Sequence, residues 1–410
     1  MVISNLIHDS IKFFCHYFFL LLLSAFTFSN ASLASDLNQS KVFFSKYFYG
    51  NSAGKKECLR GPLPPHSFSL KPEEESIRLI ASVIGFDWEN EHRKNSSSLS
   101  VKHEKISFPV RELFAISQQA VAKKDEELKK EVKNLLKKIA KSDTLLATPS
   151  LKEVKSKGGR CYDGNNNVKA VCKFHVTQFA MQFGANYIVA ASLLKDEMSD
   201  EDYKIIGNYI DKMHKKFSAP IFQQLNKQKK EFSQMANGGL SVLAYAHWKD
   251  NKILAAKTFE KIFQNIDRVF MDDGYIKGTS FRGVRGFWYH SYGTNSALSV
   301  IALADLWKVR VPKKVRDKVT NATKLLNVGI KDIKVFYARK DPDGKQKNAS
   351  YNEVHARHHM HQMAIGIAHL AAIAVDVDVN IEDDYEYKRK TPTEYPSDFT
   401  VGFNSNCMSK

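Results

Sequence analysis

The chain contains 410 residues, with 61 Lys and Arg against 44 Asp and Glu, which gives a formal net charge of +17. A field of this sign gathers polyanions. Nucleic acid is the most obvious polyanion, but the sequence contains neither a helix-turn-helix nor an RNP-type aromatic motif. An acidic polysaccharide or a membrane surface is therefore the better-fitting partner.

The N-terminus has the layout of a secretory signal peptide. Lys12 precedes a strongly apolar stretch over residues 13–28, and small residues follow up to Ala34. The alternative is an uncleaved membrane anchor, but about 16 apolar residues, interrupted by His16, fall short of the roughly 20 that span a bilayer. We expect cleavage after Ala34 and a periplasmic or secreted protein without stable insertion in a membrane.

The mature chain of about 375 residues is long for one domain, but it suits a closed helical fold with a single shared core. We expect residues 1–34 to be the signal peptide and residues 35–57 a polar leader. Residues 58–380 are expected to form one domain, and residues 381–410 an irregular tail of acids, bases and prolines.

The cysteines indicate an oxidising compartment. Of the five, Cys15 leaves with the signal peptide. The even remainder, Cys58, Cys161, Cys172 and Cys407, suits two disulfides and is too widely spaced for a zinc knuckle. The spacing leaves all three possible connectivities open.

Two segments predict irregular structure. Residues 58–65 contain three prolines, which lack an N–H donor and fix φ, so this stretch is expected to form an extended arm over the surface. Residues 95–100 are rich in serine and follow charged residues, which favours a mobile polar loop.

Apolar residues spaced three or four apart predict helices along most of the remaining chain. Ser199, with Asp202 three residues later, has the spacing of a helix cap, and residues 363–375 are apolar enough for a buried helix. Alternating strand patterns are scarce, so the sequence predicts an all-α fold of antiparallel helical hairpins closing on themselves. The apolar stripes are Leu128, Val132, Leu135, Leu136 and Ile139; Ile206, Tyr209, Ile210 and Met213; Phe259, Ile262, Phe263, Ile266 and Phe270; and Ala297, Val300, Ile301, Ala304 and Trp307.

The densest group of chemically active side chains lies in residues 272–292. If residues 282–292 form a helix, two arginines and two tyrosines fall within about 80° of one face. Gly283 and Gly286 would each cost roughly 1 kcal/mol in a helix interior, so we expect a tertiary reason for them, such as the close approach of another segment. The four residues on the shared face are Arg282, Arg285, Tyr289 and Tyr292.

Two cations and two phenols on one stripe suit β-elimination from a uronic acid. A guanidinium can neutralise the sugar carboxylate, which makes the neighbouring C5 proton acidic. A tyrosine whose pKa is lowered by nearby arginine can remove that proton and then protonate the departing oxygen. The alternative is purely structural, because aromatic residues at helical spacing are usually core and arginine usually pairs with a carboxylate.

The same segment carries a characteristic order of motifs. Residues 273–276 read Asp-Gly-Tyr-Ile, Arg285 follows, and residues 289–292 read Tyr-His-Ser-Tyr before an apolar helix. This order resembles the alginate lyases of polysaccharide lyase family 5, which show an acidic-Gly-aromatic turn, an Arg-rich run, Tyr-His-Asn-Tyr and an apolar helix. A weaker match extends upstream to residues 239–242 and 250–252.

The resemblance implies an incomplete α/α toroid with a lid loop over a cationic cleft, acting by elimination without a metal or other cofactor. Arg285 matches the family's catalytic arginine, and Tyr292 matches its base and acid tyrosine. Residues 88–100 occupy the place of the lid, which makes Trp88 and Arg93 candidate substrate contacts.

The resemblance also implies a disulfide pairing. Cys58 before a proline cluster and Cys172 at the opening of a helix resemble the family's N-terminal disulfide. That pairing leaves Cys161 with Cys407.

The chain departs from the family at one informative place. Where the family has Asn-Asn-His and uses Asn and His to neutralise the carboxylate, this chain has Phe232, Ser233 and Gln234, with Asn237 nearly one turn later. Gln234 can donate a hydrogen bond but supplies no cationic imidazole. Either His290 or another group substitutes as a third catalytic residue, or the preferred sugar differs, or activity has been lost. Arg282, Tyr289, Gln234 and Asn237 are the candidate substrate-binding residues of this region.

A histidine cluster near the C-terminus leaves three readings open. His355, His358 and His359 lie one helical turn apart, as metal ligands can. Arg357 within the cluster would repel a cation, and only Glu353 is an adjacent acid. The alternatives are a second wall of the polyanion cleft, with His358 binding substrate, and ordinary surface histidines.

Hydrolytic chemistry fits the sequence less well. A glycoside hydrolase needs two opposed carboxylates, but Asp272 and Asp273 are adjacent, while Asp341 and Asp343 lie in an expected loop. No nucleophile-elbow signature suggests a Ser-His-Asp site. We therefore predict a monomeric lyase for an acidic, alginate-like polysaccharide, with no nucleic acid, metal or cofactor. The rival from another class is a non-catalytic toroid that binds or guards a polyanion during export.

Overall fold

The computed structural model describes residues 42–59, 73–87, 99–148, 150, 173–223, 225, 232–337, 339, 352–361, 363–383 and 405–409. The chain divides into two compact units, Met1–Lys41 and Val42–Lys410, and every described residue belongs to the second unit. The expected signal peptide and most of the expected lid over residues 88–100 therefore lie outside the described residues. So do Trp88, Arg93, Cys161 and Cys172.

The second unit is built from helices. Its longer helices are α2 (Glu73–Ala81), α4 (Leu99–Lys123), α5 (Glu126–Lys141), α7 (Lys173–Ser192), α8 (Asp200–Met213), α10 (Phe232–Trp248), α11 (Lys252–Val269), α12 (Arg285–Leu306), α13 (Lys313–Lys331), α14 (Glu353–His361) and α15 (Ala364–Val375). A π-helical turn, η4 (His214–Ser218), leads from α8 into the short α9 (Ala219–Phe222). Short 3₁₀ turns are η1 (Asn51–Gly54), η2 (Lys56–Cys58), η3 (Lys195–Glu197), η5 (Ile333–Phe336), η6 (Ile381–Asp383) and η7 (Ser405–Ser409).

The apolar stripes that predicted helices are buried. All four sets of residues lie in the core, on α5, α8, α11 and α12 and at the residues that end α11 and α12. Ser199 caps α8, since its hydroxyl accepts a hydrogen bond from the Asp202 N–H at 3.2 Å. The buried helix expected over residues 363–375 is α15.

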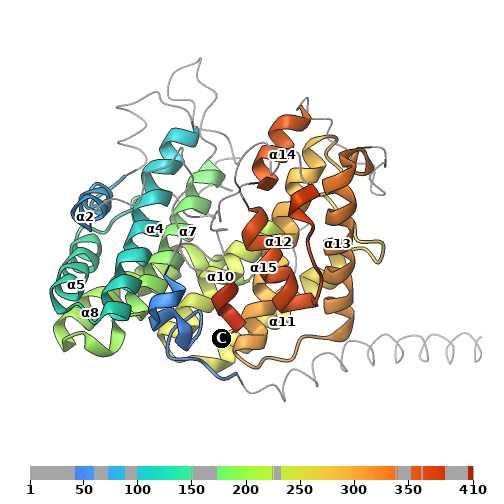
Figure 1. Ribbon diagram of the computed structural model, residues 1–410. Helices are drawn as coiled ribbons and strands as arrows, with labels where there is room; N and C mark the ends of the chain where they lie inside the picture. The colour runs from blue at the N-terminus through green and yellow to red at the C-terminus, as the bar shows by residue number, and fades with distance from the viewer. Residues whose placement is uncertain are drawn as a thin grey trace, which may run out of the picture. The chain divides into compact units, whose positions relative to one another are not determined.

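The central helices pack against one another in chain order. Helix α4 packs against α7, α7 against α10, and α10 against α12, while α12 also packs against α14 and α15. Figure 1 shows this succession from α4 to α12. Helices α5, α11 and α13 pack on α4, α10 and α12, and most of their charged residues are exposed on the opposite face. Helix α12 thus lies between several neighbours and is mostly buried.

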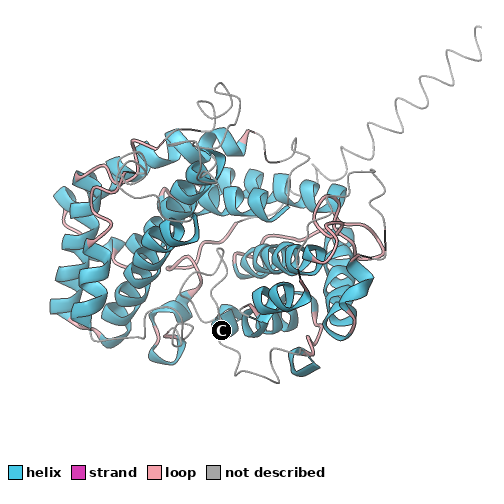
Figure 2. Ribbon diagram, turned by 90° about the horizontal axis from the view of Figure 1, so that it is seen from above, coloured by secondary structure: helices cyan, strands magenta, loops and turns pink. Residues whose placement is uncertain are grey.

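The expected all-α fold is confirmed. Figure 2 shows helices and loops throughout the described residues. Within those residues the β-type contacts are two isolated bridges, Phe270 with Ile276 and Arg282 with Val284. None of the helices in the described ranges combines the length and apolarity that crossing a membrane requires.

The expected polar leader packs in part into the core, through buried side chains of residues 42–57. Phe48 is buried, and its carbonyl accepts a hydrogen bond from Trp307 Nε1 at 3.2 Å. The Trp307 ring centre lies 4.8 Å from that of Phe44 and 5.7 Å from that of His247. The aromatic side chains of this segment bury against the end of α12, which a count of its polar residues does not reveal.

The pairing of the cysteines differs from the expected one. Cys58 forms a disulfide with Cys407, so the prediction of Cys58 with Cys172 and Cys161 with Cys407 is wrong. Ser52 Oγ donates to the Cys407 carbonyl at 2.7 Å, and η1 packs against η7. The two ends of the unit lie together, although the two cysteines are separated by 349 positions in the sequence.

The expected irregular tail over residues 381–410 contains η6 and η7. Cys407 and Met408 in η7 are buried at 2% exposed. The end of the tail therefore belongs to the core as well.

We predict that replacing both Cys58 and Cys407 with serine lowers the free energy of unfolding by roughly 2–5 kcal/mol, because the disulfide closes a very long loop in the unfolded chain. Urea denaturation of parent and variant measures the difference. Peptide mapping without reduction should recover a linked Cys58–Cys407 peptide. Recovery of Cys58 linked to Cys172 would contradict the pairing.

Candidate functional site

The candidate site lies where the loop after α11 runs into α12. Helix α12 begins at Arg285, so Arg282 lies in the loop, whereas the helix expected over residues 282–292 included it. Gly283 is the reason, because its φ of +59° takes the backbone off the right-handed helical path. The two arginines are therefore presented by different elements.

Arg282, Arg285 and Tyr289 lie together. Arg285 Nη2 donates to Tyr289 Oη at 3.1 Å, and Arg285 Cζ lies 5.2 Å from the centre of the tyrosine ring. Arg282 Cζ lies 4.2 Å from the same ring centre, and Arg282 Nε donates to the Gly278 carbonyl at 3.1 Å. Two guanidinium groups thus converge on one phenol, and their joint positive charge attracts an anion.

Tyr292 extends this group along α12. It follows Arg285 by seven residues, two turns along the same face, and is half-buried. Trp288 also belongs here, although sequence reasoning gave it no role. Its ring centre lies 5.3 Å from Arg285 Cζ and 4.8 Å from the ring centre of Tyr289. The start of α12 therefore combines cations that can hold a carboxylate with phenols that can transfer a proton.

His290 is a core residue, and this corrects the catalytic role expected for it. Its side chain is 0% exposed. Nε2 donates to the Ala322 carbonyl at 2.9 Å, and Nδ1 lies 2.9 Å from Ser280 Oγ. Burial lowers the pKa of His290 to about 4, so the ring is neutral at physiological pH. His290 follows Tyr289 by one residue and so points roughly 100° away from it around the helix, toward α13.

Gly286 marks the closest approach of the loop to α12. A Cβ at this position would lie 2.2 Å from the Ser280 carbonyl oxygen, so only glycine fits. The Gly286 N–H donates to the Gly283 carbonyl at 2.7 Å. The expected close approach is confirmed for Gly286, whereas Gly283 lies before the helix and is required by its positive φ.

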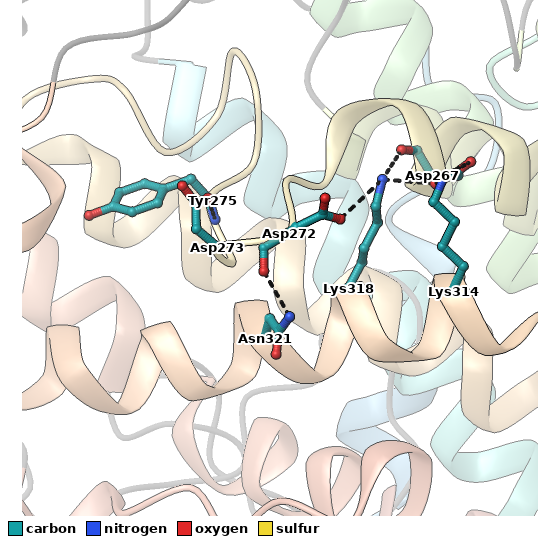
Figure 3. A network of polar contacts seen from close by, with 7 residues as sticks. All are labelled: Asp267, Asp272, Asp273, Tyr275, Lys314, Lys318 and Asn321. Carbon is teal, nitrogen blue, oxygen red and sulfur yellow. Dashed lines mark hydrogen bonds and ion pairs between the residues drawn. The ribbon is translucent and has the colours of Figure 1, made fainter.

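Helix α13 holds the beginning of the loop. Lys318 is buried at 8% exposed, and its Nζ lies 2.8 Å from Asp267 Oδ1 and 3.9 Å from Asp272 Oδ1. Lys314 Nζ lies 3.0 Å from the same Asp267 oxygen. Asn321 Nδ2 donates to the Asp272 carbonyl at 2.8 Å. Figure 3 shows Lys318 reaching from α13 between the two carboxylates, with Asn321 beneath the turn.

The Asp-Gly-Tyr turn is anchored on its other side by the segment after α13. Asp273 forms an ion pair with Arg339, whose Cζ lies 4.5 Å from the ring centre of Tyr275. The Tyr275 hydroxyl donates to the Val335 carbonyl at 2.8 Å. Asp273 and its neighbour Asp272 therefore hold the loop, and their contacts give no support to a two-carboxylate hydrolytic site.

The other predicted site residues are more widely distributed. Asn237 on α10 is 1% exposed and cannot contact a polymer in this conformation, which corrects its assignment as a substrate contact. It falls on the buried side of α10, which packs against α7 and α12. Gln234 lies on α10 and His358 on α14, but their side chains are outside the described part of the structure.

A separate polar hollow lies between α4 and α7. It is small and is lined by Arg111, Ser107, Gln182 and Asn186 with apolar neighbours. Arg111 is 2% exposed, and its Cζ lies 5.7 Å from the ring centre of Phe108. The central helices therefore carry an arginine, Arg111 on α4, in addition to the arginines at the start of α12.

No group of three or more His, Cys, Asp or Glu residues that could hold a metal ion occurs among the residues the structure describes. The side chains of His355, His358 and His359 lie outside that set. That this cluster binds a metal ion therefore remains a hypothesis.

Comparison with known proteins found no family model that matches the chain and no significant match among curated proteins. The function is therefore inferred from the chemistry of the site and from the motifs of the sequence.

Because the buried histidines have lowered pKa values, we expect the free energy of unfolding to depend on pH. An unfolded histidine has a pKa near 6.5, whereas burial lowers that of His290 to about 4. Between these values the unfolded chain binds a proton that the folded chain does not, so stability is full above about pH 6.5 and falls as the pH decreases toward about 4. His290 contributes roughly 3 kcal/mol to this fall.

A His290→Gln variant should be less stable than the parent near neutral pH but should lose less stability on acidification. Urea denaturation at about pH 7 and about pH 5 measures both losses. Burial also lowers the pKa values of His214 and His247 to about 4, so the loss should shrink rather than vanish. Equal losses in parent and variant would contradict the assignment.

Proposed function

We propose that this chain is a polysaccharide lyase that cleaves an acidic, uronate-containing polysaccharide of the alginate type by β-elimination. The observation that carries the proposal is the convergence of Arg282 and Arg285 on Tyr289, with Tyr292 on the same helical face. The resemblance of residues 273–292 to the alginate lyases adds support.

The arginines would neutralise the sugar carboxylate. A guanidinium carries five N–H donors in a planar fork, so it can hold a neighbouring phenol and grip a carboxylate at once. Neutralisation of that carboxylate stabilises the negative charge that develops when the adjacent C5 proton leaves. Arg285 is the principal candidate, because its position on α12 is fixed relative to both tyrosines.

Tyr292 would transfer the proton. As a phenolate it takes the proton from C5, and the electron pair of that C–H bond forms the C4–C5 double bond while the C4–O4 bond breaks. As a phenol it then returns the proton to the departing O4 oxygen. The products are a new reducing end and an unsaturated uronate, and no water, metal or redox partner enters the balance.

The proposal also includes a specific arrangement of the helices, an incomplete α/α toroid, and a periplasmic or secreted location. The central helices α4, α7, α10 and α12, with α5, α11 and α13 packed on them, have the pairing that an incomplete α/α toroid requires. A disulfide within the second unit suits a periplasmic or secreted protein.

One observation favours the rival function, a non-catalytic module that binds a polyanion. His290 carries the imidazole that was expected to replace the family's missing Asn-His pair, but that ring is buried and neutral. Among the described residues that meet at Tyr289, the positive charge therefore comes from the two arginines. A binding module needs the two arginines but has no need of Tyr292.

We predict that Tyr292→Phe lowers turnover of polymannuronate by about 10⁴-fold, because one residue serves as both base and acid. The variant keeps the ring, so folding and polymer affinity should persist. Turnover is measured as the rate at which unsaturated chain ends form, which is monitored by their ultraviolet absorbance. Tyr203→Phe, which changes an exposed tyrosine on α8, is the matched control and should keep the parent rate. Near-parental turnover in Tyr292→Phe would remove the residue from the mechanism.

We also predict that affinity for polymannuronate falls roughly tenfold or more between low and high salt, because ions screen exposed charges over about 8 Å at physiological ionic strength. Arg282→Ala should weaken binding and flatten this dependence. Arg316→Ala on α13, which removes an arginine paired with Asp305 at 2.7 Å, is the control and should leave both unchanged. An affinity of the parent protein for polymannuronate that does not change with salt concentration would contradict a cationic site.

A further inference from the structure

Arg282 is held by a tight turn in the loop before α12. The Ser280 N–H donates to the Ile276 carbonyl at 2.8 Å, and the Ile276 N–H donates to Ser280 Oγ at 2.8 Å. Arg282 Nε donates to the Gly278 carbonyl inside this turn at 3.1 Å. Ser280 closes the turn from both sides, so the direction of the Arg282 side chain depends on it.

Ser280 is in turn held by His290. Both residues are 0% exposed. Because the Ala322 carbonyl can only accept, His290 Nε2 carries the ring proton, and Nδ1 accepts from the Ser280 hydroxyl at 2.9 Å. The Ser280 oxygen can still accept from the Ile276 N–H. One continuous set of hydrogen bonds thus joins the turn to α12 and, through Ala322, to α13.

This set of hydrogen bonds explains why a histidine occupies this buried position. Placing an imidazole in a core costs free energy unless both nitrogens are satisfied, and an apolar side chain would fill the same space without that demand. Both nitrogens of His290 are satisfied, and one of its partners is the residue that shapes the Arg282 turn. Arg285 needs no such support, because its contact with Tyr289 runs between residues four apart on one helix.

We propose that Ser280 and His290 are positioning residues for Arg282, which hold its guanidinium over Tyr289 so that two cations, rather than one, meet the carboxylate of the substrate. The identity of the carboxylate rests on the proposed function. Neither Ser280 nor His290 touches the sugar, since both are buried. Their effect is specific to Arg282, and it leaves the contact between Arg285 and Tyr289 in place.

A double-mutant cycle tests this specificity on the full chain. Ser280→Ala, Arg282→Ala and the combined variant are titrated with a short mannuronate oligosaccharide by calorimetry at one fixed salt concentration. Each single change should weaken binding by about tenfold, and Ser280→Ala should cause no further loss once Arg282 is gone. Ser299→Ala removes another fully buried hydroxyl from α12, bonded to the Asn295 carbonyl, and should bind like the parent.

A second readout needs no ligand. In protein labelled with ¹⁵N at arginine, the Arg282 Nε–H signal should exchange slowly with solvent in the parent and rapidly in Ser280→Ala, while the Arg285 signals stay unchanged. His290→Gln should behave like Ser280→Ala, because its amide falls where Nε2 stood. His290→Asn should be milder, because its amide falls where Nδ1 stood and can still meet Ser280.

The two readouts separate the proposals. If the parent binds no uronate oligosaccharide, the proposed function fails, and the exchange of Arg282 Nε–H still decides the positioning role. Binding losses that add across the cycle would overturn that role. So would an Arg282 signal that is unchanged in Ser280→Ala and His290→Gln.

Discussion

The site depends on the place where the loop before α12 touches the helix. At Gly286 the helix backbone lies so close to the Ser280 carbonyl that no side chain fits between them. The contact is possible because the left-handed Gly283 turns the chain into α12 directly after Arg282. A loop held this closely places Arg282 near the ring of Tyr289, and the helix places Arg285 near the same ring. The joint cationic character of the site therefore depends on one backbone contact.

The remaining architecture stabilises the two elements that meet there. Helix α13 fixes the start of the loop through Lys318 and Asn321, and Arg339 fixes the Asp-Gly-Tyr turn. The far end of α12 is held by Trp307, which packs against the N-terminal aromatic residues. The disulfide then ties that N-terminal segment to the end of the chain. A long, mostly buried helix anchored at both ends is a rigid support, as precise placement of catalytic groups requires.

The sequence predicted those features that follow from spacing along one helix. Val132 and Ile139 are buried because a helix repeats every 3.6 residues, and the same rule brings Arg285 beside Tyr289. Contacts between distant segments followed no such rule. The bond from Ser280 to His290 crosses a non-helical loop, and the Cys58–Cys407 link spans the unit. The catalytic role predicted for His290 was wrong because the motif does not show that His290 points into the core, as Ser291 also does, while Tyr289 and Tyr292 are half-buried.

We propose that the two arginines and Tyr292 form a catalytic site for elimination. The test is to incubate the parent protein with a panel of polyuronates and to monitor the ultraviolet absorbance. We expect growing absorbance from unsaturated chain ends on at least one polymannuronate-like polymer, without added metal. Tight binding of such a polymer with no unsaturated product from any member of the panel would contradict the catalytic claim and favour a polyanion-binding protein.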